Sequence, residues 1–193
     1  MNRLKPPRDA IIFLRDLLNI KHFVETGTGL GRTTHMVAPL FEQVTTMELN
    51  DMRWDVAIRA FAPQKHVTCL HGHSVDLLPG VLEDLVGPAM FFLDAHCVSR
   101  ALKAPMTCPL LEEIALVRTH SPYHVLLIDD VHFFVASAPR RSVGQWPGLV
   151  DIINALQIAG KPYVVIYGDN FIAVPDGIRS SVDEFLGKVE GHG

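Results

Sequence analysis

The chain has 193 residues, 48% of them hydrophobic, and a formal net charge of −4. This length fits one domain of ordinary size, and the acidic balance argues against a nucleic-acid backbone as partner, because such binding needs a basic face. No apolar run is long enough to cross a bilayer, so we expect a soluble protein without a membrane partner.

The cysteines bear on the cellular compartment. The chain has an odd number of cysteines, namely Cys69, Cys97 and Cys108. No apolar signal core follows the basic N-terminus. Reduced thiols and a cytoplasmic location are therefore expected. The spacing also lacks the short Cys-x-x-Cys pairs of structural zinc sites.

Strand and helix patterns alternate along the chain. After an amphipathic helix at Ala10–Leu18, strands are expected at Phe23–Glu25, Val44–Leu49, Val67–His71, Met90–Asp94, Val125–Asp129, Val164–Tyr167 and Phe171–Val174. Helices are expected at Thr33–Phe41, Met52–Ala62, Val75–Leu85, Pro109–Thr119, Leu149–Ala159 and Ile178–Lys188. The alternation predicts βαβ units and a parallel α/β sheet. We expect a single domain over residues 1–193, with an N-terminal helical segment (1–20), a core (23–174) and a C-terminal helix and tail (175–193).

The last two strands break this pattern. Only Gly168, Asp169 and Asn170 separate them, so they are expected to form an antiparallel hairpin with Asp169 and Asn170 in its turn. Two long irregular segments, Ala95–Cys108 and Val131–Pro147, follow strand ends. Open α/β sheets bind their ligands there, so these segments are expected to form the substrate pocket.

The strongest local motif is Glu25-Thr26-Gly27-Thr28-Gly29-Leu30-Gly31, which ends the first strand and opens a helix. Gly27 and Gly29 permit a sharp turn close to a ligand, and Gly31 permits close packing of helix on strand. A dinucleotide fingerprint would need its third glycine one place later. Glu25 would repel a pyrophosphate but suits a cationic ligand that carries an amino group.

This acid-x-Gly-x-Gly-x-Gly motif resembles the first motif of class I S-adenosylmethionine-dependent methyltransferases. The resemblance implies a Rossmann-like three-layer αβα sandwich, a mostly parallel seven-stranded sheet with a C-terminal antiparallel hairpin, and S-adenosylmethionine as cofactor. Glu48, about twenty residues past the glycines and followed by Leu49, is expected to accept hydrogen bonds from the ribose hydroxyls. The resemblance also places adenine at the loop after the third strand, where His73 and Ser74 stand and where the family usually has an acid.

Acids and histidines follow the fourth and fifth strands, as Asp94-Ala95-His96-Cys97 and Asp129-Asp130-Val131-His132. Adjacent parallel strands bring these ends together, so Asp94, Asp129 and Asp130 are candidate ligands of Mg²⁺. The pattern resembles metal-dependent O-methyltransferases of the catechol and macrolide-sugar types, although Cys97 replaces the catalytic lysine of the catechol enzymes. The alternative chemistry uses His96 or His132 as a general base beside Asp94 and Asp129.

A second resemblance is to small bacterial methyltransferases with Leu-Asp-x-His and Ile-Asp-Asp strand ends and a Pro-Leu-Leu-Glu-Glu helix. Here Pro109, Glu112 and Glu113 are interpreted as a helix start, where proline and acids are favoured.

Three functions stay open at this point. The first is Mg²⁺-assisted O-methylation of a small hydroxylated molecule, such as a sugar or a natural-product intermediate. The second is metal-independent O- or N-methylation with a histidine base, and the third is a non-catalytic S-adenosylmethionine-binding protein. With one helix before the first strand, the acceptor pocket needs the two long segments or a second subunit, which predicts a homodimer.

Overall fold

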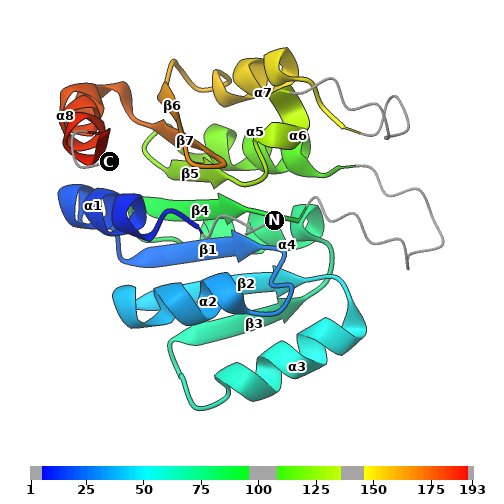
Figure 1. Ribbon diagram of the computed structural model, residues 1–193. Helices are drawn as coiled ribbons and strands as arrows, with labels where there is room; N and C mark the ends of the chain where they lie inside the picture. Colours follow the sequence, from blue (N-terminus) through cyan, green and yellow to red (C-terminus); the bar gives the residue numbers. More distant parts are fainter. Residues whose placement is uncertain (1–5, 96–107, 136–145, 191–193) are drawn as a thin grey trace.

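The computed structural model describes residues 6–95, 108–135 and 146–190 (Figure 1). Its strands are β1 (His22–Thr26), β2 (Gln43–Glu48), β3 (Val67–His71), β4 (Ala89–Leu93), β5 (Val125–Ile128), β6 (Tyr163–Tyr167) and β7 (Asn170–Val174). They form one seven-stranded sheet in the order β3-β2-β1-β4-β5-β7-β6. The first five strands of this order are parallel, and β7 runs antiparallel to both β5 and β6. The predicted mixed sheet is thus confirmed.

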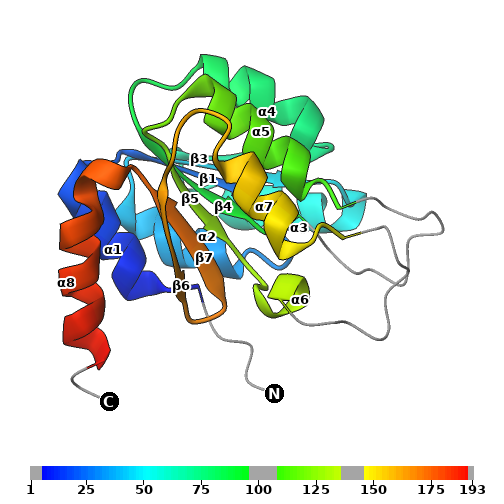
Figure 2. The same ribbon diagram turned by 90° about the horizontal axis from the view of Figure 1, so that it is seen from above.

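Helices cover both faces of the sheet (Figure 2). They are α1 (Arg8–Leu18), α2 (Arg32–Val37), α3 (Asp51–Phe61), α4 (Ser74–Glu83), α5 (Leu110–His120), α6 (His132–Val135), α7 (Leu149–Leu156) and α8 (Arg179–Glu190), with 3-10 turns at Ala38–Leu40 and Asp176–Ile178. Buried side chains of α4, α5 and α7 join one core, and those of α1, α2 and α8 join the other. The result is the expected three-layer αβα sandwich.

The central strands are continuous apolar runs because both of their faces are covered. Successive residues point to opposite faces of a strand. Phe91 therefore lies in the core with α4 and α5, while Phe92 lies in the core with α1 and α8, and neither ring reaches solvent.

The C-terminal hairpin is tighter than expected. Tyr167 pairs with Asn170, so Gly168 and Asp169 form a two-residue turn and Asn170 is a buried strand residue. The terminal helices then pack on the sheet and on each other. The ring of Phe13 in α1 stacks on that of Phe185 in α8 at 4.5 Å, and the Tyr167 hydroxyl donates to Asp9 at 2.5 Å.

Two predicted helices and one segment predicted to be irregular need correction. The expected helix Thr33–Phe41 ends at Val37 and continues as a 3-10 turn, because Pro39 cannot continue the α-helical hydrogen bonding. The expected helix from Ile178 begins instead as α8 at Arg179, after a 3-10 turn. The segment from Val131, expected to be irregular, opens with the single turn α6.

The chain changes sides of the sheet between β1 and β4. After β1 it enters α2 on one face, and after β4 it enters α5 on the opposite face. In open α/β sheets, the crevice outside the carboxyl ends of two such strands is where ligands bind. Among the described residues, no helix has the length and apolar character needed to cross a membrane.

Candidate active site

The glycine loop lies directly after β1 and bends back over β2. The backbone N–H groups of Gly27 and Thr28 both donate to the carbonyl of Met47, at 2.9 and 3.0 Å. Gly27 has a φ of +83°, and a Cβ atom there would lie 2.5 Å from the backbone oxygen of Asp94. Only glycine therefore allows the loop to approach the end of β4 this closely.

Glu48 connects the glycine loop to the end of β2. Its carboxylate accepts hydrogen bonds from the backbone N–H of Gly29 at 2.8 Å and from that of Asn50 at 2.9 Å. A carboxylate offers about four acceptor positions, so this group retains capacity for hydroxyl donors. The next residue, Leu49, is 40% exposed and offers an apolar surface beside it.

Glu25 lies inside the protein and not on the wall of the crevice. It is 1% exposed, and one carboxyl oxygen accepts from the hydroxyls of Thr34 at 2.5 Å and Thr46 at 2.6 Å. Burial raises the pKa of Glu25 to about 7, against the opposing effect of these hydroxyls. Thr28 joins the same group through a 2.6 Å contact between its hydroxyl and that of Thr46. In this structure Glu25 therefore supports the loop from beneath.

The two residues predicted to face adenine are at the start of α4. His73 is the N-cap residue, and its Nδ1 accepts from the backbone N–H of Val75 at 3.3 Å. Ser74 is the first helical residue and is buried. His73 thus caps α4, in addition to any contact that it makes with a ligand.

Asp94 and Asp129 stand on neighbouring strands at the same edge of the sheet. Leu93 pairs with Ile128, and each aspartate follows one of these residues. The N–H of Asp94 donates to the carbonyl of Thr26 at 3.0 Å, and the N–H of Asp129 donates to that of Leu93 at 3.2 Å. The backbone therefore places both acids beside the β1–β4 crevice. His96 and Cys97, also expected here, lie outside the described residues.

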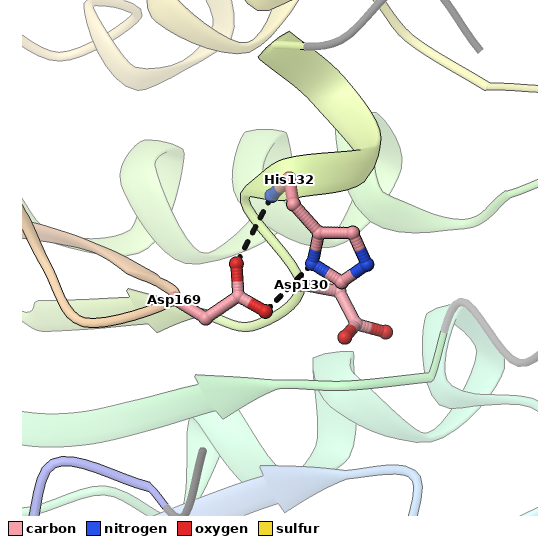
Figure 3. Close-up of side chains that lie close together, drawn as sticks. All are labelled: Asp130, His132 and Asp169. Carbon is pink, nitrogen blue, oxygen red and sulfur yellow. Dashed lines mark hydrogen bonds and ion pairs between the residues drawn. The ribbon is translucent and has the colours of Figure 1, made fainter. Parts of the chain in front are cut away.

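His132 and Asp169 form a hydrogen-bonded pair at this edge (Figure 3). The Asp169 carboxylate accepts from the backbone N–H of His132 at 3.0 Å and from its ring Nδ1 at 2.6 Å. The N–H of Val131 also donates to the carbonyl of Asp169, at 3.0 Å. The turn between β6 and β7 is thereby attached to the chain that follows β5. Asp169 is more than the turn residue that the sequence predicted.

Asp130 completes a group of three side chains around this pair. It adopts a left-handed φ of +58°, and its carboxylate lies beside the His132 ring (Figure 3). One ligand atom from each of Asp130, His132 and Asp169 lies within 4.8 Å of the others, and no second such group occurs in the described part of the chain. Of the three predicted Mg²⁺ ligands, this group includes Asp130 but neither Asp94 nor Asp129. A donor set with imidazole also suits transition metals better than Mg²⁺.

The sequence matches no known family model and no curated protein. The structure, in contrast, resembles many solved chains. An O-methyltransferase from Bacillus cereus in complex with S-adenosylhomocysteine is 18% identical, with a TM-score of 0.60, and the match covers 90% of this chain and 82% of that one.

Two further solved structures show the same likeness. An amino pentose methyltransferase from Micromonospora echinaspora, with S-adenosylmethionine bound, is 13% identical with a TM-score of 0.54, covering 89% of this chain and 92% of that one. An S-adenosylhomocysteine-bound methyltransferase from Podospora anserina is 14% identical with a TM-score of 0.56, and the match covers 86% of this chain and 76% of that one. The chain therefore has the class I methyltransferase fold.

Proposed function

We propose that this protein is an S-adenosylmethionine-dependent methyltransferase that methylates a hydroxyl group of a small molecule. The observation that carries the proposal is the contact between the Glu48 carboxylate and the glycine loop, at the carboxyl edge of the sheet. It occurs in a fold shared with proteins whose structures hold S-adenosylmethionine or its demethylated product.

The described residues at this edge fit the cofactor. Glu48 supplies the acceptor oxygens that a ribose diol needs. A Cβ atom on Gly29 would meet no other atom within 4 Å, so the loop has open space on that side. Bound there, the cofactor would supply a methyl group on a positively charged sulfur, ready for in-line attack by the acceptor oxygen.

His132 is our candidate for the general base. An acceptor hydroxyl must lose a proton when it is methylated, and histidine performs this near neutral pH. Because Nδ1 of His132 donates to Asp169, the neutral ring carries no proton on Nε2, which is then the basic atom. The His132 side chain is about half exposed, so a substrate can reach it.

Metal assistance is the second candidate, because one ligand atom from each of Asp130, His132 and Asp169 lies within 4.8 Å of the others. A metal there would lower the pKa of the acceptor hydroxyl and occupy the imidazole. Removal of metal therefore distinguishes the histidine-base mechanism from the metal-assisted one. EDTA should leave a histidine-base enzyme active and should abolish turnover of a metal-dependent one, with recovery on adding Mg²⁺ or Mn²⁺.

The decisive experiment is calorimetric titration of S-adenosylmethionine and S-adenosylhomocysteine into EDTA-treated protein, with and without Mg²⁺. We expect micromolar binding that Glu48→Gln weakens at least about tenfold, because the ribose loses a charged acceptor. The matched control is Glu42→Gln, an exposed acid that pairs with Lys21. Absence of binding by both ligands in all conditions would refute the proposed function.

A second copy of the chain remains our proposal for completing the acceptor pocket. The helix α1, which precedes β1 in the described residues, uses its buried side chains Ala10, Ile11 and Leu14 in the core with α2 and α8 and not to cover the crevice. Sedimentation should give twice the mass of one chain, and a monomer mass at working concentration would refute the dimer.

A further inference from the structure

Glu113 is a second buried acid, in the helix α5 on the face of the sheet that α4 and α5 cover. It lies in the first turn of α5, where the sequence predicted an acid that stabilises the helix start. Its neighbour Glu112 fits that description and is exposed, whereas Glu113 is 0% exposed. The Glu113 carboxyl group faces the hydroxyls of Thr26, which ends β1, and Ser74, which begins α4. It therefore lies beside the end of β1, where the glycine loop begins.

Among the described residues, this carboxyl group has two hydroxyls beside it but no cation to compensate for its burial. Both of its oxygens are buried, and neither makes a hydrogen bond of good geometry with any described residue. The hydroxyls of Ser74 and Thr26 nevertheless lie close enough to lower its pKa in part, against the larger effect of burial. Within the described part of the chain, the groups that act on its charge are the hydroxyls of Ser74 and Thr26, which favour ionisation, and the carboxylate of Glu112, which opposes it. None of them is a cation. A buried, unsatisfied acid of this kind requires an explanation, such as a charged ligand absent from the structure.

The cofactor of the proposed function would bring the missing positive charge. S-adenosylmethionine and S-adenosylhomocysteine share their amino and carboxyl groups, and they differ in charge only at sulfur. The methylated sulfur is a cation, and the sulfur of the product is neutral. A carboxylate in a region of low dielectric acts strongly on such a charge even without direct contact.

We propose that Glu113 is the counter-charge that makes this pocket prefer the cationic methyl donor over its neutral product. The inference rests on the proposed function. It gives a physical reason why a new molecule of the methyl donor would replace the product in the pocket. Burial raises the pKa of Glu113 to about 7, so part of the cofactor-free protein is protonated there at neutral pH. The cation favours the ionised form. Binding of S-adenosylmethionine should therefore release a proton to the buffer, and binding of the product should not.

The first test uses the unaltered protein. Calorimetric titrations at pH 7 in two buffers with different ionisation enthalpies measure the protons released on binding. We expect proton release with S-adenosylmethionine and with sinefungin, an analogue that carries an ammonium group in place of the methylated sulfur. We expect much less release with S-adenosylhomocysteine. Equal release for all three ligands would overturn the inference.

The second test compares Glu113→Gln with the exposed control Glu42→Gln. In Glu113→Gln the affinity for S-adenosylmethionine should fall about tenfold, while that for S-adenosylhomocysteine stays within about twofold. The preference for the methyl donor should rise from pH 6 to pH 8 in the unaltered protein and stay flat in this variant. Equal weakening of both ligands would indicate a structural effect and would refute the counter-charge while leaving the methyltransferase proposal intact. If the unaltered protein binds neither ligand, both proposals fail.

Discussion

The carboxylate of Asp169 holds the imidazole of His132 across 37 positions of sequence, with 2.6 Å between Oδ2 and Nδ1. The pair exists because β7 inserts between β5 and β6. This order brings the β6–β7 turn beside the residues that follow β5. The backbone N–H of His132 donates a second hydrogen bond to the same carboxylate. Asp169 therefore holds the backbone of His132 as well as its side chain.

If His132 is the base, its substitution should affect turnover and not cofactor binding. His132→Gln should lower kcat about 100-fold or more, the usual contribution of a general base. Asp169→Asn should lower it less, because the ring loses its orientation but stays in place. The affinity for S-adenosylhomocysteine should stay within about twofold in both variants. The exposed Asp176→Asn serves as control, and unchanged kcat in His132→Gln would exclude this base.

The two glycines of the loop should differ in their tolerance of alanine. At Gly27 a Cβ atom would meet the backbone of Asp94 and Ala95 at 2.5–3.0 Å, whereas at Gly29 it would meet nothing. Both have positive φ, so each alanine costs about 1 kcal/mol of backbone strain. Gly27→Ala should cost about 2 kcal/mol more from overpacking. Urea denaturation measures both, and equal losses would contradict this account of the loop.

The buried acids should make the protein less stable as the pH rises. Burial raises the pKa of Glu25 and of Glu113 from 4.5 to about 7, so between these values the folded chain binds more protons than the unfolded chain. Their contribution to the free energy of unfolding is fully present below pH 4.5 and is lost as the pH rises through 7. The loss is on the order of 3 kcal/mol for each acid.

Urea denaturation between pH 5 and pH 8 tests this pH dependence. Glu25→Gln and Glu113→Gln should each remove part of the decline, and the exposed control Glu42→Gln should not. A variant that retains the full decline would show that its acid is not the cause.

His124 should make the protein less stable as the pH falls below neutral. It is buried, its Nδ1 accepts from the backbone N–H of Ala89 at 3.1 Å, and its Nε2 lies 2.9 Å from Nδ1 of His120. Burial first, then the charges of His120 and Arg118, lower the pKa of His124 to about 4. The unfolded chain therefore binds this proton first, and the stability that neutral His124 contributes is lost as the pH falls from about 6.5 to 4.

His124→Asn tests this assignment, because an asparagine oxygen can also accept from Ala89. The variant should lose less stability than the unaltered protein between pH 6.5 and pH 4 in thermal denaturation. An equal loss in both proteins would place the acid sensitivity elsewhere.

Much of the fold follows from short-range patterns. Strands buried on both faces are apolar along their whole length, and helices repeat with a different period, so β1 to β7 and most helices are predicted close to their observed positions. The glycine loop and Glu48 are equally local signals. Asp94, Asp129 and Asp130 could be placed at one edge of the sheet, because parallel strands end on the same side.

The sequence by itself therefore determined the methyltransferase fold, the glycine loop and the row of acids after the strands. Only the tertiary structure decided which of these groups meet. Asp169 looked like a turn residue, and it binds His132 because β7 pairs with β5. Glu113 looked like one of two acids at a helix start, and it is buried because α5 packs on α4. Contacts of this kind depend on how elements pack, and the packing of one helix turn or hairpin leaves no periodic pattern in the residues that form it.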